Sequence, residues 1–179
     1  MLVDAYPGRV LSFDEHTSQY FSNQYTTARA TWYGVSGVPD VYFDGGAHVV
    51  GGGSGSGACL AMYQTYLPIY TSIMNECGGM SPVGIEGTFT INGLTATLTA
   101  TFVLVEPVDV GTVRAAFFLS EDGLVYSSQT WNHITRVIEY ANVTGLNEVG
   151  DEVTVVKQIT LNSAWVPANL NAAVALESP

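Results

Sequence analysis

Two cysteines are the side chains of this sequence best suited to redox chemistry, and their spacing argues against it. Cys59 and Cys77 do not form a Cys-x-x-Cys pair, so the chain has no dithiol redox centre. They fit either a structural disulfide or two buried free thiols. A straight helix would hold them about 27 Å apart, too far to bond. Because Pro68 argues against one straight helix, residues 59–66 could double back, and we favour the disulfide because the composition resembles that of extracellular proteins.

The three histidines do not form a recognisable catalytic or metal-binding pattern. His16 follows Asp14 and Glu15, but adjacent residues of a strand point to opposite faces, so we expect a loop or edge histidine. His48 and His133 have no partner ligands at zinc spacing. We therefore predict no catalytic, cofactor-binding or metal-ligating residues, no cofactor, and a chain that is not an enzyme.

Acidic and aromatic side chains allow two binding alternatives. Carboxylates that could take calcium occur at turns, but none gives the alternating oxygen ligands of a dedicated loop, and we favour the simpler explanation that Asp and Gly populate turns anyway. They are Asp40, Asp44, Glu121, Asp122, Glu148, Asp151 and Glu152. Ten tyrosines and three tryptophans are enough for a carbohydrate-stacking platform, although most have the spacing of core or interface residues.

Composition excludes several classes of protein. The 179 residues carry a net charge of -11, and only 5 are Lys or Arg, so the basic footprint of a nucleic-acid-binding protein is missing. No apolar run approaches the roughly 20 residues of a membrane-spanning helix. Hydrophobic residues make up 47%, which argues against disorder. The first residues do not read as a signal peptide, so we expect an unexported protein, a mature form or a fragment.

The first half of the chain mixes strand and helix patterns. We predict a strand over 8–14, a helix over 17–33, a strand over 41–43 with a short return strand at 49–50, and a mobile linker at 51–57. Apolar positions at helical spacing follow in 58–76. There we predict a helix with a break or start near Pro68.

After Pro82 the pattern changes to alternating strands. Asn92-Gly93 marks a hairpin between strands at 85–91 and 94–104. Further strands are predicted at 113–119, 124–127, 134–140, 153–161 and 171–176. These short strands predict an antiparallel sandwich. The fold class is therefore α+β, with domains at 1–80 and 81–179.

The segment Gly37-Val38-Pro39-Asp40-Val41-Tyr42-Phe43-Asp44-Gly45 resembles the later part of a thioredoxin-like domain, which implies a cis-proline at Pro39. The second half resembles an immunoglobulin-like sandwich. The two in this order resemble the outer-membrane-protein-twenty-eight-like family of secreted and surface bacterial proteins, whose activity is not settled. The residues that carry this resemblance are Tyr6 to Val10, His16, Arg29, Trp32 to Val35, Glu121, Asp122, Trp131 to Arg136, Trp165 and Asn171 to Ala175.

The strand patterns suggest assembly. Sheet edges are normally protected by lysine or inward-pointing charges, yet this chain has one lysine, Lys157, and long Thr/Val/Ala strands such as 95–105. We predict a non-catalytic structural or adhesive module, extracellular or on the cell surface, that pairs with its own copies or another surface protein. Thr97→Lys with Thr99→Lys should then weaken self-association. The alternatives are a fragment of a thiol–disulfide oxidoreductase-like protein and a carbohydrate- or protein-binding surface module.

Overall fold

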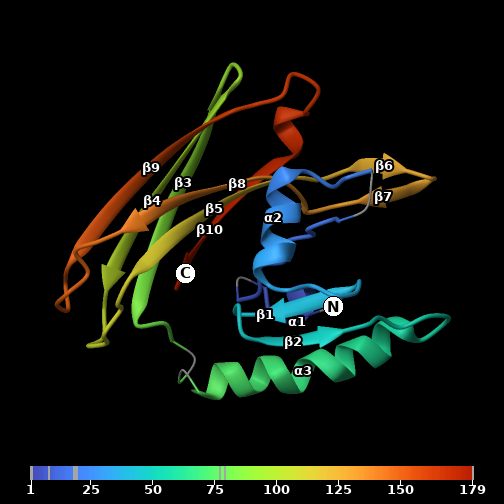
Figure 1. The fold of residues 1–179 in the computed structure, drawn as a ribbon, viewed down its shortest axis with the longest axis horizontal. Coiled ribbons are helices and arrows are strands. Elements are labelled where there is room, and N and C mark those ends of the chain that lie inside the picture. Colours follow the sequence, from blue (N-terminus) through green and yellow to red (C-terminus); the bar gives the residue numbers. More distant parts are fainter. Residues whose placement is uncertain (1, 8, 18–19, 77, 79, 179) are drawn as a thin grey trace. The chain divides into compact units, whose positions relative to one another are not determined.

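The computed structural model describes residues 2–7, 9–17, 20–76, 78 and 80–178 (Figure 1). It is an α+β fold whose sheets are antiparallel. The chain forms two compact units, one of residues 1–12 and 29–81 and the other of residues 13–28 and 82–179. The main boundary lies next to the expected one at residue 80, but residues 13–28 belong to the second unit.

The first unit contains a short hairpin and a long helix. Its elements are α1 (Leu2–Ala5), β1 (Asp40–Phe43), β2 (Ala47–Val50) and α3 (Ala58–Glu76). The Asp44-Gly45 turn between β1 and β2 has positive φ at both residues, which fits the Asp-Gly pair. Helix α3 continues through Pro68, so the predicted break there is wrong. It packs through aromatic contacts between Phe43 and Tyr66 and between Tyr6 and Tyr70, and none of its side chains is fully buried.

Helix α2 (Gln24–Trp32) begins later than predicted because Asn23 is its cap. The Asn23 side-chain oxygen accepts hydrogen bonds from the backbone N–H groups of Tyr25 (2.9 Å) and Thr26 (3.1 Å). The Thr26 hydroxyl in turn accepts the Asn23 N–H. This reciprocal cap satisfies the first turn, and residues 17 and 20–23 are not helical.

The predicted strand at 8–14 is reduced to one bridge. Asp14 donates its N–H to the His133 carbonyl and accepts from the N–H of Thr135, both at 3.0 Å. Beside it, the ring of Phe13 stacks on Phe118 with centroids 4.2 Å apart. The segment thus covers an apolar patch on the outer face of a sheet in the second unit. The patch consists of Ala116, Phe118 and Ile138.

The second unit is a sandwich of two three-stranded sheets with an added hairpin. The sheet orders are β10-β5-β8 and β3-β4-β9, and β6 pairs with β7. The strands are β3 (Val83–Asn92), β4 (Thr95–Leu104), β5 (Val113–Glu121), β6 (Leu124–Tyr126), β7 (Gln129–Trp131), β8 (Ile134–Val143), β9 (Glu152–Thr160) and β10 (Leu170–Glu177), with a short 3-10 turn at Pro167–Asn169. The predicted hairpin at Asn92-Gly93 is confirmed. Strand β7, only three residues long, was not predicted.

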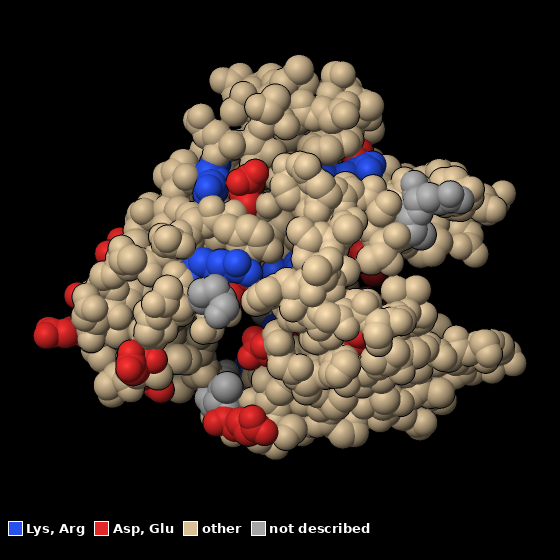
Figure 2. Space-filling view, in the orientation of Figure 1, with Lys and Arg blue, Asp and Glu red and all other residues tan. Residues whose placement is uncertain are grey.

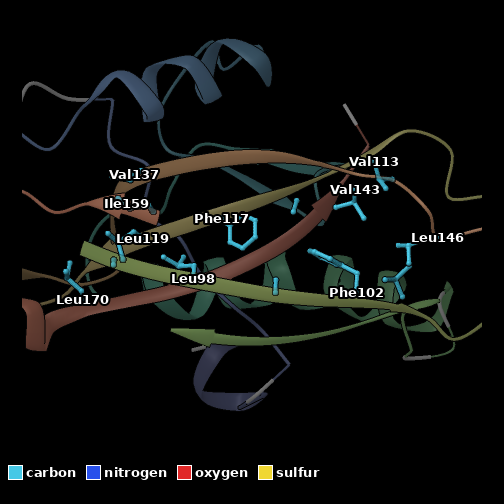
Figure 3. Packing of buried hydrophobic residues seen from close by; sticks show 14 of the residues in the cluster. Leu98, Phe102, Val113, Phe117, Leu119, Val137, Val143, Leu146, Ile159 and Leu170 are labelled. Atoms are coloured by element: carbon cyan, nitrogen blue, oxygen red, sulfur yellow. The ribbon is translucent and has the colours of Figure 1, made fainter. Parts of the chain in front are cut away.

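The hydrophobic core lies between the two sheets. Alternate residues of each strand point inward, so β4 contributes Leu98 and Phe102 while β5 contributes Phe117 and Leu119 (Figure 3). The other buried members are Val83, Ala96, Ala100, Leu104, Val113, Ala115, Val137, Val143, Leu146, Ile159, Leu161 and Leu170. Every fully buried hydrophobic side chain among the described residues belongs to this second unit.

Candidate functional site

One side of the sandwich carries an inward-pointing ion pair between two edge strands. Strand β8 is an edge of its sheet, and β9 is the neighbouring edge of the other sheet. Lys157 of β9 shares its face with the core residue Ile159, and Glu139 of β8 shares its face with the core residue Val137. The Lys157 ammonium lies 4.0 Å from the Glu139 carboxylate. An inward-pointing lysine on an edge strand is one of the devices that prevent further strand pairing.

The opposite side of the sandwich has no such charge. There β10 and β3 are the edge strands, and they lie beside each other. Their inward-facing residues beyond the buried core are apolar or glycine, and most are partly exposed. We call these residues the open margin: Ile85, Gly87, Phe89 and Ile91 of β3, and Ala172, Val174 and Leu176 of β10. The only acidic residue within β10 is Glu177, whose carboxylate lies 3.3 Å from Arg114 at the end of the strand.

The edge chosen from the sequence is therefore wrong. Thr97 and Thr99 lie on β4, which is the central strand of its sheet and pairs with both β3 and β9. Alternation in a strand indicates which face is buried, but it does not indicate which strand lies at an edge. The same limitation hid the role of Lys157, which alternation places on the inner face without revealing its partner.

The β6–β7 hairpin carries an aromatic cluster and projects beyond the two sheets (Figure 1). The Trp131 ring makes an edge contact with His16 at 5.1 Å and lies 6.2 Å from Phe21, centroid to centroid. Phe21 contacts Tyr126, whose ring lies 3.8 Å from that of Tyr20. His16 is therefore part of a packed aromatic cluster. Its predicted position as a loop histidine is confirmed.

Hydrogen bonds hold the base of this hairpin. The Asp122 carboxylate accepts the backbone N–H of His133 at 2.6 Å and the side-chain amide of Asn171 at 3.0 Å. The side-chain oxygen of Asn132 accepts the N–H of Gly123 at 2.9 Å. Sequence reasoning considered Asp122 as a calcium ligand, whereas here its carboxylate is used to fix the turn.

Next to this turn, Glu121 forms a buried ion pair. Its side chain is 2% exposed, and Oε2 accepts from Nε and Nη2 of Arg136, both at 2.8 Å. Its other oxygen accepts the N–H of Val166 at 2.9 Å, and the Arg136 guanidinium lies over the Trp165 ring. The hydrogen-bonding groups of Glu121 and Arg136 are paired with each other and with Val166, so we interpret this network as structural support.

Asp14 lies close to two imidazoles. The residue is exposed overall, yet desolvation of its carboxyl by the surrounding protein raises the pKa of Asp14, and the charges of His16 and His133 oppose that rise. The sequence neighbours Asp14 and His16 thus interact electrostatically, without the hydrogen bond that a catalytic dyad requires.

The first unit holds a second histidine–carboxylate contact that sequence reasoning missed. His48 Nδ1 lies 3.0 Å from Asp40 Oδ1, and the Asp40 side chain is 3% exposed. The His48 ring stacks on Tyr42, and the Tyr42 hydroxyl donates to the Tyr33 carbonyl at 2.8 Å. Burial, followed by the charge of Asp40, raises the pKa of Tyr42. Residues 40 and 48 come together because β1 pairs antiparallel with β2, a register that pairs Tyr42 with His48.

The remaining predicted site residues have different outcomes. The Val38–Pro39 peptide is cis, as expected at Pro39. Cys59 is an exposed free cysteine at the start of α3, and Cys77 lies outside the described residues. The predicted disulfide requires residues 59–66 to double back. That prediction is wrong, because these residues lie in a continuous helix that extends to Glu76. At 1.5 Å per residue, such a helix separates its two ends by about 27 Å.

The described residues contain no cluster of three or more potential metal ligands. Asp40 and Asp44 lie at opposite ends of β1, and Asp151 accepts the N–H groups of Asn147 and Glu148, each at 2.8 Å. The helices among the described residues lack the length or apolar character of a membrane span. Comparisons with protein-family models, curated proteins and solved structures found no match to this chain.

Proposed function

We propose that this chain is a non-catalytic structural or adhesive module, secreted or displayed at a cell surface, whose copies associate through the open margin. The second unit would be an immunoglobulin-like sandwich. The order β1, β2, α3 in the first unit supports a partial thioredoxin-like portion. A composition with one lysine and many Thr, Tyr, Asn and Gly residues supports the extracellular location.

The observation that carries the proposal is the asymmetry between the two sides of the sandwich. The Lys157–Glu139 pair protects one side, whereas β10 and β3 leave a row of backbone groups and apolar side chains without a protecting charge. An edge strand of this kind is a template for strand addition.

We expect the occupant to be the β10 strand of a second copy. Two β10 strands related by a two-fold axis would run antiparallel, so the uncharged stretch 171–176 of each would face that of the other. Such pairing brings no like charges together at its centre, which matters between copies that each carry -11.

Light scattering after size-exclusion chromatography, over a concentration series, tests this proposal. We expect a mass that rises with concentration above the 19.1 kDa of one chain. Val174→Lys on β10 and Ile85→Lys on the adjacent β3 should each keep the chain monomeric, because an inward-pointing lysine at an edge opposes strand addition. The edge strand β9 already carries such a lysine, Lys157, so the fold tolerates one there. Ile85 is 40% exposed, so its variant should stay folded.

Thr97→Lys is the matched control, because it adds the same charge to the central strand and should leave association unchanged. A wild-type chain that stays monomeric at every concentration would overturn the proposal. So would association that persists in both margin variants while circular dichroism shows them folded.

A further inference from the structure

We propose that the β6–β7 hairpin, together with Tyr20, binds neutral carbohydrate. This site shares no residue with the open margin and does not depend on self-association. It begins with Tyr20, a residue that is 54% exposed and whose ring lies 3.8 Å from that of Tyr126, with 33° between the ring planes. One ring therefore backs the other, and much of Tyr20 remains open to solvent.

Neighbouring aromatic residues hold the Tyr20–Tyr126 pair in place. Tyr126 makes an edge contact with Phe21 at 6.2 Å, Phe21 lies 6.2 Å from Trp131, and Trp131 contacts His16. The base of the hairpin is fixed by the Asp122 and Asn132 hydrogen bonds. A platform that is already ordered loses little conformational entropy when a ligand binds.

The chemistry of the hairpin selects an uncharged ligand. From Leu124 to Trp131 the sequence has no charged residue, in a chain of net charge -11, and the hairpin tip is uncharged on the face shown in Figure 2. An ionic ligand would call for opposite charge, which is missing here. The exposed residues around Tyr126 instead offer hydroxyl and amide groups. They are Ser127, Ser128, Gln129 and Thr130.

This combination matches a pyranose ring. A sugar has a face of C–H groups, whose partial positive charge is attracted to the electron-rich face of a tyrosine. Its hydroxyls require neutral donors and acceptors at the rim of the platform. The turn residues Ser127 and Ser128, which directly follow Tyr126, both have positive φ, at 51° and 65°, which fits a two-residue hairpin turn.

Affinity electrophoresis tests the proposal, with soluble neutral glucan, xylan and mannan as probes and alginate as the anionic comparison. We expect at least one neutral polysaccharide to retard the full chain. Tyr20→Ala should weaken that binding about tenfold, as loss of a stacking contact worth about 1.4 kcal/mol would do. Tyr20→Phe, which keeps the ring, should bind nearly as well as the wild type.

Trp32→Ala is the control for exposed aromatic surface, because Trp32 is 44% exposed and belongs to the first unit. It should not change the retardation. No retardation by any neutral polysaccharide would overturn the proposal, as would binding to alginate alone. Unchanged binding by Tyr20→Ala would also overturn it. Light scattering on the same variant separates this result from self-association, which Tyr20→Ala should leave unaltered.

Discussion

The ring of Phe13 stacks on the ring of Phe118, with centroids 4.2 Å apart and planes 17° from parallel. These residues lie more than a hundred positions apart in the sequence, and the contact joins residues 13–28 to the outer face of the β10-β5-β8 sheet. The second unit therefore has one core between its sheets and a smaller apolar cluster on the outside of one sheet.

Phe13→Ala should destabilise the chain by about 2 to 3 kcal/mol, because it removes a large apolar side chain from this outer cluster. The value lies below that of a fully buried phenylalanine because Phe13 is only partly buried. Urea unfolding followed by circular dichroism measures it. Leu11→Ala is the control, since Leu11 is 72% exposed and should change the free energy of unfolding by less than about 0.5 kcal/mol. Equal stability of the two variants would show that the outer cluster contributes nothing.

Glu121→Ala should destabilise the chain by about 3 to 5 kcal/mol, because it leaves the Arg136 guanidinium without its buried carboxylate and the Val166 N–H without its acceptor. Urea unfolding again provides the measurement. Glu139→Ala breaks the more exposed pair with Lys157 and should cost less than about 1 kcal/mol. If both variants lose the same free energy, burial does not set the strength of the Glu121 pair.

Asp151→Asn should lower stability at neutral pH. The backbone N–H groups of Glu148 and Asn147 lower the pKa of Asp151 below its ordinary value of 3.8. The ionised carboxylate therefore stabilises the folded state above pH 3.8, and this contribution is lost as the pH falls through the lower folded pKa. Thermal unfolding of wild type and variant from pH 7 to pH 2 should show a difference in Tm that shrinks below about pH 4.

Asp14→Asn should change the stability at neutral pH in the opposite direction to Asp151→Asn. Desolvation raises the pKa of Asp14 above 3.8, so the cost of ionising Asp14 in the folded state grows as the pH rises above 3.8 and is fully present above the folded pKa. The variant should be the more stable protein at neutral pH, and its advantage should vanish as the pH falls towards 3.8. A pH-independent difference in either variant would contradict the electrostatic explanation.

The elements set by local pattern were predictable. Alternation in 85–104 and the Asn92-Gly93 pair predicted β3, β4 and their turn, and the Asp44-Gly45 pair predicted the turn between β1 and β2. The continuity of α3 was not predicted, because the helix-breaking tendency of Pro68 was given more weight than the helical spacing of apolar residues on both sides of it. The start of α2 was misplaced because threonine and serine, the residue types at 17 and 18, also cap helices, whereas the structure shows Asn23 in that role.

The candidate sites depend on contacts between distant segments, which one sequence does not reveal. His48 meets Asp40 through a hairpin register, and Lys157 meets Glu139 because two different sheets adjoin at their edges. Tyr20 and Tyr126 lie far apart in the chain and come together at the added hairpin. Local periodicity predicts an element and its buried face. It does not predict which elements adjoin.

The interleaved order of the two units has a consequence for protein synthesis. Residues 13–28 leave the ribosome before about fifty residues of the first unit and long before β5 and β8, the strands that they cover. Phe13 has no finished surface to pack on while the first unit is being made. Domains that are continuous in sequence can fold one after the other from the N-terminus. Residues 13–28 cannot fold as they are made, because the strands that complete their unit, up to β10, are translated after the whole of the first unit.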